Sequence, residues 1–272
     1  MKHPIGKIIL ITTLILVIIA TLFPLVWMAT SSVKTEDEIY SDPPTWIPKN
    51  FTFKHYNELF TRFHFNQLTM NSIIISLSVT SISTILGSMA AYGFSRYGFR
   101  GSSIILGFIL LSRMITPTAL VVPLYVLMRL LGLDNTVFSI IIGITVSNLP
   151  FVVWIMKPFF DGLPKEIEEA AELDGLSPIG VFWKIAMRLA SPGVYTAILF
   201  SFIAGWVDFL FGISFSTTVR SMPLTAGLMQ MQTGYEIYWG PLMAGGMYLI
   251  LPTFLLAFAL QKYLIRGLRV GF

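Results

Sequence analysis

The segment Asp161–Pro192, DGLPKEIEEAAELDGLSPIGVFWKIAMRLASP, interrupts a chain that is otherwise dominated by apolar runs. It carries nine acidic or basic residues, although only 12% of all 272 residues are charged. The apolar runs before and after it are long enough to cross a bilayer as helices. We therefore predict that this segment lies at a membrane surface between two transmembrane spans.

Two short helices are predicted inside this segment. Pro164 suits the first position of a helix, the acidic residues that follow suit its first turns, and Gly175 can adopt the left-handed conformation that ends it. These signals predict a first helix from Lys165 to Asp174. Ser177 and Pro178 then suit the start of a second helix. Four apolar residues share one face of that second helix: Phe182, Ile185, Ala186 and Leu189.

The composition of the chain is that of a membrane protein. Hydrophobic residues make up 55% of it, and its mean hydropathy is +0.76. It has no cysteine, which excludes a disulfide framework, a thiolate zinc site and a cysteine nucleophile. The net charge is +4, but the basic residues are dispersed and form no stripe, so the sequence does not indicate nucleic-acid binding.

Six apolar runs of about 20 residues are predicted to cross the membrane as helices, because backbone polar groups in hydrocarbon must be satisfied internally. An even number of spans puts both termini on one side. Eleven basic residues fall on that side and six on the other, so both termini are expected in the cytoplasm. The predicted spans are Ile8–Met28, Asn71–Phe94, Ile104–Leu127, Val137–Met156, Val194–Phe215 and Pro241–Tyr263.

Two further regions have an informative composition. The loop from Lys34 to Asn66 contains three prolines, and it carries aromatic residues at Tyr40, Trp46, Phe51, Phe53 and Tyr56. It is therefore expected to be ordered, either as a cap on the outer helix ends or as a surface for an external partner. The second span is rich in small and hydroxyl residues. This pattern predicts a helix that is buried among others or that lines a wet path.

The acidic helix at 165–174 has two interpretations that its spacing leaves open. It can dock into a groove of another protein, or it can be a solvated connector. The string GLPKEIEEAAELDGLS resembles the EAA loop of permeases from bacterial binding-protein-dependent ABC importers. Further stretches resemble the carbohydrate-uptake branch, in particular the subunit type represented by the maltose permease G protein: MITP at 114–117, PLY at 123–125, LGLDNT at 131–136 and WVDFL at 206–210.

This resemblance, which covers roughly residues 71 to 267, implies an all-α membrane protein with six transmembrane helices and a cytoplasmic coupling helix between spans four and five. The coupling helix, Pro164 to Asp174, would insert into a cleft of a separate ATPase, where Glu169 would meet a basic residue. Its movement would rock the spans between inward-open and outward-open states. The residues implied in coupling are Glu169, Ala170, Ala171, Asp174, Gly175 and Leu176.

The resemblance also implies a division of the chain and a set of partners. Residues 1–67 would hold the first span and an extracytoplasmic loop, residues 68–265 the permease core with its EAA loop at 161–192, and residues 266–272 a cytoplasmic tail. The expected partners are an ATPase dimer that binds ATP and Mg²⁺, a second homologous permease subunit and an extracytoplasmic solute-binding protein, in a prokaryotic inner membrane. The chain itself is expected to hold no cofactor, no metal and no catalytic residue.

The chain departs from the family pattern in two places. Many relatives carry Leu-Pro where this chain has Met187 and Arg188, so the second helix is expected to continue unbroken here. The carboxyl tail, Arg266–Phe272, resembles the start of the relatives' glycine-rich tail but stops short of its usual end.

Two charged residues inside predicted spans are candidates for contact with the solute, because an ion within the bilayer costs about 2.5 to 3.5 kcal/mol on insertion scales. Arg113 lies near the middle of span three and could bind solute hydroxyls or an anionic group, or pair with a neighbouring helix. Asp208 lies late in span five beside Trp206. This carboxylate and indole could bind a sugar, or the carboxylate could brace a helix. A direct pair of Arg113 with Asp208 is not expected, since their depths differ.

The function expected from these features is import of a sugar or a sugar-like solute, coupled through the EAA loop to a separate ATPase. The chain has no G-x-x-x-x-G-K-[ST] run, so ATP hydrolysis is expected in another subunit. The alternatives are an ABC importer permease for a non-sugar solute and a self-sufficient secondary carrier, for which no convincing internal repeat is found. A membrane enzyme is disfavoured, since H-E-x-x-H and G-x-S-x-G motifs are missing from the sequence.

Overall fold

The computed structural model describes the backbone of residues 4–232 and 236–270 and the side chains of residues 6–232 and 236–261. Within these ranges the fold is helical, and the only β pairing is an isolated bridge between Gln232 and Ile237. The chain divides into two compact units. The first comprises Met1–Phe65 and Gly227–Leu251, and the second comprises Asn66–Ala226 and Pro252–Phe272.

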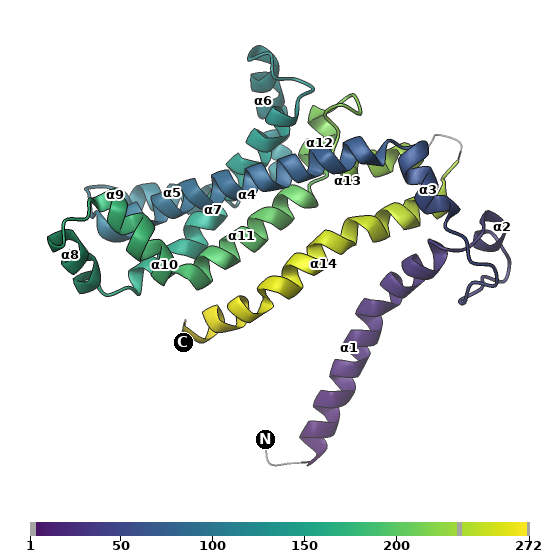
Figure 1. Cartoon of the computed structure of the whole chain (residues 1–272), viewed down its shortest axis with the longest axis horizontal. Helices are drawn as coiled ribbons and strands as arrows, with labels where there is room; N and C mark the ends of the chain where they lie inside the picture. Colours follow the sequence, from purple (N-terminus) through teal and green to yellow (C-terminus); the bar gives the residue numbers. More distant parts are fainter. Residues whose placement is uncertain (1–3, 233–235, 271–272) are drawn as a thin grey trace. The chain divides into compact units, whose positions relative to one another are not determined.

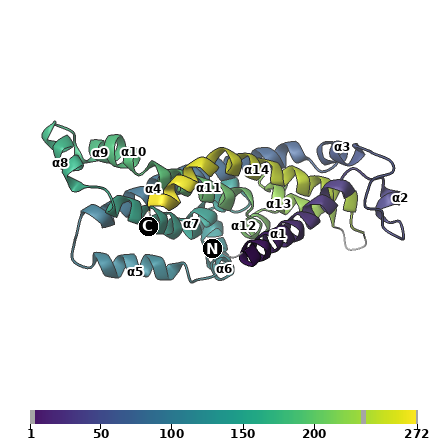
Figure 2. The same cartoon turned by 90° about the horizontal axis from the view of Figure 1, so that it is seen from below.

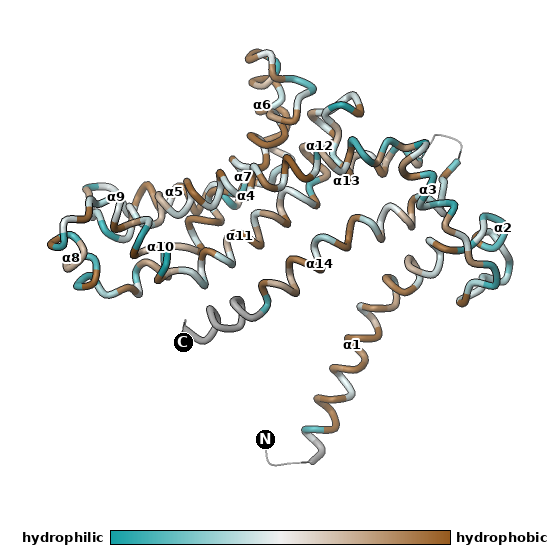
Figure 3. Tube along the Cα trace, in the orientation of Figure 1, coloured by the Kyte–Doolittle hydropathy of each residue, from teal (hydrophilic) through white to brown (hydrophobic). Residues whose placement is uncertain are grey.

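The first unit begins with the long helix α1, Pro4–Ser31, which is apolar along most of its length (Figure 3). Two short helices follow it, α2 at Glu36–Ile39 and α3 at Lys54–Thr61. The loop between the first two predicted spans is therefore folded, as its prolines and aromatic residues predicted. The last helix, α14, runs from Trp239 to Val270 and contributes residues to both units.

Two buried charged side chains hold the segment after α1 together. Lys34 is only 1% exposed; its ammonium lies 4.5 Å from the Trp27 ring centroid and donates to the carbonyl oxygen of Thr45. The Glu38 carboxylate accepts the N–H of Lys49 at 2.9 Å and the hydroxyl of Thr45 at 2.8 Å. The bond from Lys49 is the main cause that lowers the pKa of Glu38, against the opposing effect of burial. The hydrogen bonds and the ring contact thus offset the cost of removing each of these two charges from water.

Three long helices form the core of the second unit: α4 (Phe65–Arg96), α7 (Val137–Asp161) and α11 (Ser191–Trp206) (Figure 1). A side chain at Gly205 would place its Cβ 2.7 Å from the Cα of Ser76, so α11 and α4 cross at backbone contact. The amide of Asn148 on α7 donates to the Ser201 hydroxyl on α11 at 2.8 Å. The predicted burial of the second span among other helices is confirmed by its buried hydroxyl residues, which are Ser72, Ser76, Thr80, Ser83, Thr84 and Ser88.

The predicted all-α membrane fold is confirmed. Four helices of the described residues are long and apolar enough to cross a membrane: Gly6–Ser31, Phe65–Arg96, Val137–Asp161 and Trp239–Gln261. Two bent helix pairs bring the number to six if each pair counts as one span. One pair is α5 (Ser102–Ser112) with α6 (Pro117–Leu130), bent by 98°; the other is Pro178–Leu189 with α11, bent by 85°.

Two spans predicted as continuous helices are broken. The span at Ile104–Leu127 turns sharply after Ser112, because Pro117 has no backbone N–H and the residue before it, Thr116, is extended with ψ 138°. The span predicted at Val194–Phe215 ends as α11 at Trp206 and resumes as the short helix α12, Leu210–Phe215. Two short elements follow α12: α13, Leu224–Gly227, and a 3-10 turn, Leu228–Met231.

The predicted tail at 266–272 is described only in part. The backbone of α14 continues to Val270. The side chains of this tail and residues 271–272 lie outside the described part of the chain. The prediction that the tail departs from the family pattern therefore concerns residues that the structure does not describe in full.

Candidate functional site

The acidic segment between α7 and α11 begins with helix α8, Lys165–Leu173, at one end of the second unit (Figures 1 and 2). The predicted helix is confirmed, with Asp174 as its C-cap and with Pro164 at the N-cap instead of the first helical position. Gly175 adopts φ +89° and donates its N–H to the carbonyl oxygen of Glu172 at 2.9 Å. The N–H of Leu176 donates to the carbonyl oxygen of residue 171 at 3.1 Å. These two bonds form a Schellman motif, which the left-handed glycine permits.

The second predicted helix is present but has a different register. The Ser177 hydroxyl accepts the N–H of Gly180 at 3.2 Å and caps α9, Pro178–Val181. A π turn at Phe182–Ala186 and the short α10, Met187–Leu189, continue it without a break, as the sequence predicted. The predicted shared face is wrong at Leu189, which is 45% exposed, whereas Phe182 and Ala186 are buried. The π turn causes this difference, because its extra residue rotates all later side chains around the helix.

A buried ion pair fastens α8 to the end of α4. Arg96 and Glu168 are each 8% exposed. The Arg96 guanidinium donates from Nε to Oε2 of Glu168 at 2.9 Å and from Nη2 to Oε1 at 2.8 Å. Oε2 also accepts the Tyr92 hydroxyl at 2.8 Å, and Nη2 also donates to the carbonyl oxygen of Leu163 at 3.1 Å. Both ends of the pair are thus satisfied, as a buried ion pair requires.

An aromatic contact fastens the next part of the segment. The ring of Phe182, in the π turn, lies 5.2 Å from the ring centroid of Tyr92 on α4 and 6.3 Å from that of Phe160 on α7. Ala186 and Ala190 are fully buried in the same apolar cluster. The segment from α8 to α10 is therefore attached to two long helices of the second unit by one ion pair and one cluster of rings.

The opposite face of α8 is open. Glu169, Ala170 and Asp174 are exposed, Leu173 is 90% exposed and Leu176 is half-buried. Of the two alanines implied in coupling, only Ala170 is exposed. Ala171 is 7% exposed, because consecutive residues of a helix point about 100° apart. The open face thus presents two carboxylates, the small side chain of Ala170 and, at the end of the helix, the apolar side chain of Leu173.

Sequence reasoning missed the ion pair. The available signal was Tyr92 and Arg96, which are four residues apart at the end of the second span, together with an acidic helix long enough to present one carboxylate inward. Nothing in the pattern distinguished Glu168 from Glu169. The structure does so, by burying Glu168 and exposing Glu169.

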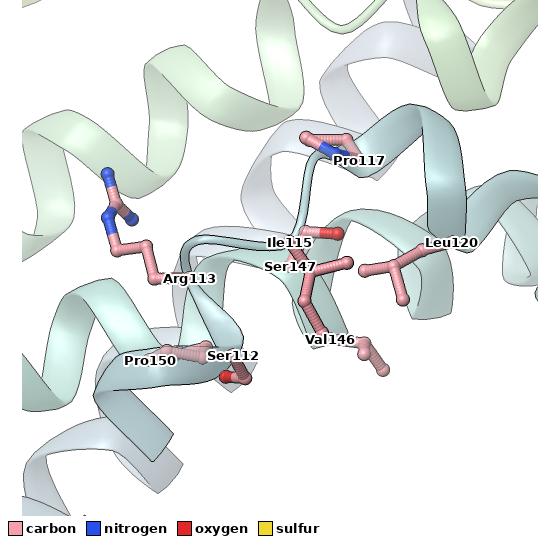
Figure 4. A pocket seen from close by; sticks show the side chains of 8 residues that line it. All are labelled: Ser112, Arg113, Ile115, Pro117, Leu120, Val146, Ser147 and Pro150. Carbon is pink, nitrogen blue, oxygen red and sulfur yellow. The ribbon is translucent and has the colours of Figure 1, made fainter. Parts of the chain in front are cut away.

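Arg113 lies at the bend between α5 and α6 and extends from it, as Figure 4 shows. Its guanidinium is 4.1 Å from the Phe151 ring centroid on α7, a cation–π contact. Among the side chains that the structure describes, no carboxylate pairs with it. The bend borders a pocket of about 300 Å³, which is at the small end of the range for ligand sites. The pocket is lined by Ser112, Arg113, Ile115, Pro117, Leu120, Val146, Ser147 and Pro150.

Asp208 lies in the break between α11 and α12, and Trp206 is the last residue of α11. The Asp208 carboxylate accepts the N–H of Gly212 at 2.9 Å, which favours the alternative in which it braces a helix. Trp206 is 2% exposed, and its ring stacks on Phe202 with centroids 5.8 Å apart. The structure brings neither residue to the pocket beside Arg113. Within the described side chains, no ion pair joins Arg113 to Asp208.

Comparison with known proteins gives similarity over the whole chain. Residues 83–270 match the family described as "Binding-protein-dependent transport system inner membrane component". The chain is 33% identical to "Probable ABC transporter permease protein YurM" of Bacillus subtilis, over 99% of this chain and 89% of that protein. It is also 33% identical to "Trehalose/maltose transport system permease protein MalG" of Thermococcus litoralis, over 99% of this chain and 98% of that protein.

The fold is similar to that of a solved structure titled "Crystal structure of a bacterial ABC transporter involved in the import of the acidic polysaccharide alginate". The TM-score is 0.82 at 20% sequence identity, over 97% of this chain and 99% of that chain. At this identity the likeness concerns the fold alone.

Proposed function

The chain belongs to the family of binding-protein-dependent transport system inner membrane components, and from this premise we propose that it is the transmembrane permease subunit of an importer that brings a sugar or sugar-like solute into a prokaryotic cell. It is a multi-pass membrane protein. We further propose that a separate ATPase dimer, which binds ATP and Mg²⁺, drives it. A second permease subunit and an extracytoplasmic binding protein complete the transporter.

The observation that carries this proposal is the two-sided construction of α8. Its inner face is fastened to α4 by Glu168 and Arg96, which are both almost fully buried. Its outer face presents Glu169 and Asp174 with no charged partner among the described side chains. A solvated connector needs no such attachment, whereas a lever must transmit force from an outer contact to the spans. We therefore assign α8 as the coupling helix and place it, with both termini, in the cytoplasm.

The carbohydrate assignment rests on relatives. The Thermococcus litoralis protein is named for trehalose and maltose, and a protein of Mycobacterium tuberculosis that is 31% identical over 94% of this chain is named for trehalose transport. A pocket beside Arg113, with the hydroxyls of Ser112 and Ser147 in its lining, offers hydrogen-bond partners that suit a polyhydroxylated solute. We place part of the solute path at this bend.

The coupling role is tested with the complete transporter reconstituted in liposomes. The double variant Glu169→Gln and Asp174→Asn should lose transport and solute-stimulated ATP hydrolysis, because the contact with the ATPase loses its carboxylates. Hydrogen exchange of α8 should stay normal, since both residues are exposed. Glu166→Gln, at an exposed position in the first turn of the same helix, is the matched control and should retain activity. Unchanged transport in the double variant would refute the coupling role of this face.

The solute is tested with the same preparation. Stimulation of ATP hydrolysis across a panel of neutral and acidic oligosaccharides, amino acids and polyamines should select a carbohydrate. Solute accumulation by the purified chain without an ATPase would instead support the secondary carrier.

A further inference from the structure

A cluster of three side chains in the first unit has no role in the transport machinery proposed above. Glu36 comes from α2, and His55 and Glu58 come from α3. One ligand atom from each, a ring nitrogen and two carboxylate oxygens, lies within 4.8 Å of the others. We propose that these residues bind one divalent transition-metal ion, with Zn²⁺ as the reference ion, and that the ion ties α2 to α3.

The ring of His55 is prepared for such a role. It is 1% exposed, and its Nε2 lies 2.8 Å from the carbonyl oxygen of Lys34. A carbonyl oxygen only accepts hydrogen bonds, so Nε2 carries the hydrogen, and Nδ1 of the neutral ring presents a lone pair. Within the described residues Nδ1 is buried without a hydrogen-bond partner, and it lies 3.8 Å from Oε2 of Glu58. A ring N–H donated to a backbone carbonyl is the usual second contact of a metal-binding histidine.

The backbone of α14 holds this ring in place. A side chain at Gly240 would put its Cβ between 2.2 and 2.5 Å from three atoms of the His55 ring. The ring therefore packs directly on the helix backbone and cannot turn Nδ1 toward solvent. A fixed ring orientation favours binding, because little freedom is lost when the ion arrives.

The two carboxylates are placed to complete the site. Glu58 directs Oε2 at the ring, while its other oxygen, Oε1, lies 3.6 Å from the ammonium of Lys54. The Lys54 side chain is 67% exposed and does not occupy the space near His55. Glu36 and Glu58 are half-buried, so water and ions reach them. Ligand atoms around tetrahedral zinc lie about 3.4 Å apart, so the cluster must close by roughly 1.4 Å at most. Rotation of two glutamate side chains covers that distance.

The donor set selects the class of ion. Imidazole nitrogen with carboxylate oxygen suits zinc and neighbouring transition metals, whereas Mg²⁺ and Ca²⁺ prefer ligands made of oxygen alone. With three protein ligands, at least one coordination position of the ion is left for a water molecule. The alternative for the same geometry is a protonated His55 paired with Glu58, which needs no metal.

The test uses the purified full chain in detergent or nanodiscs, prepared without a histidine tag and stripped with a chelator. Titration with Zn²⁺ should show one site per chain, and Co²⁺ should give the visible absorption of a low-coordinate nitrogen and oxygen site. Zn²⁺ should raise the unfolding temperature, because the ion binds the folded state alone. Mg²⁺ and Ca²⁺ at the same concentrations should produce neither effect.

Variants locate the site. Glu36→Gln and Glu58→Gln should each weaken Zn²⁺ binding by more than about 10-fold, which is the smallest loss seen for residues that only support a metal ligand. His55→Asn should abolish the Co²⁺ spectrum. His64→Asn is the matched control, since His64 is exposed and its φ of +54° suits asparagine. The proposal is overturned if the wild-type chain binds no Zn²⁺, or if both glutamine variants bind it with wild-type affinity. These readouts are independent of transport.

Discussion

The attachment of α8 to α4 can be broken at a single pair of residues, Arg96 and Glu168. The variant Glu168→Gln keeps the size of the side chain and removes the negative charge that faces Arg96. Arg96→Gln removes the positive charge and leaves the carboxylate with the Tyr92 hydroxyl as its remaining side-chain partner. Both changes should release α8 from the bundle without altering its exposed face.

The size of the effect follows from the burial of the pair. The side chains of Arg96 and Glu168 are each 8% exposed and are joined by three hydrogen bonds, so removing either charge leaves the other buried and unpaired. Such a change costs about 3 to 5 kcal/mol. Since about 1.4 kcal/mol is a factor of ten, local opening of α8 should become roughly 10²- to 4 × 10³-fold more frequent. Tyr92→Phe removes one hydrogen bond to a charged group and should cost about 1.5 to 3 kcal/mol.

Hydrogen exchange of peptides covering residues 165–173, measured on the reconstituted transporter without nucleotide, reports this opening directly. The number of solutes carried per ATP hydrolysed should fall in the same variants, because a loosened lever moves without moving the spans. Glu169→Gln is the matched control for exchange, since this neighbouring residue is exposed. Its α8 amides should exchange at the wild-type rate.

A double-mutant cycle distinguishes the ion pair from unrelated effects. The variant that combines Arg96→Gln with Glu168→Gln removes both charges, so it should be less damaged than either single variant. Wild-type exchange in both single variants would refute the reasoning. So would a double variant whose loss of protection equals the sum of the two single losses.

Three further outcomes are expected. Gly205→Ala should lower stability by about 1 to 3 kcal/mol in thermal unfolding, because its Cβ would lie 2.7 Å from a backbone atom of α4; Gly93→Ala, with open space around its Cβ, should not. Gly175→Ala, at φ +89°, should cost about 1 to 2 kcal/mol and speed exchange at the end of α8; an asparagine there should recover part of the loss. The pKa of Glu38 is lowered in the folded chain, chiefly by the N–H of Lys49. The ionised carboxylate therefore stabilises the fold fully above pH 4.5, its ordinary pKa, and this stabilisation is lost as the pH falls through the lower pKa of the folded state. Hydrogen exchange of residues 36–52 should rise in acid, and Glu38→Gln should remove that pH dependence.

Several features of the chain could be predicted from local signals. The first span and α7 are long apolar runs, and each satisfies its backbone within one helix whatever surrounds it. The end of α8 was predictable from Gly175, because few other residues adopt its conformation, and the start of α9 from Ser177 and Pro178, which suit an N-cap and a first turn. Such signals act within a few residues of each other, so a single sequence contains them.

Other features depended on contacts between distant parts of the chain, and the tertiary structure alone decided them. Glu168 and Glu169 are equivalent in the sequence pattern, and only the position of Arg96, 72 residues away, decides which of them faces inward. The π turn at Phe182–Ala186 and the burial of Trp206 likewise follow from packing against other helices. The physical reason is the same in each case. The periodicity of a sequence shows that a helix has an apolar and a polar face, but the surface against which the helix packs determines which side chains are buried.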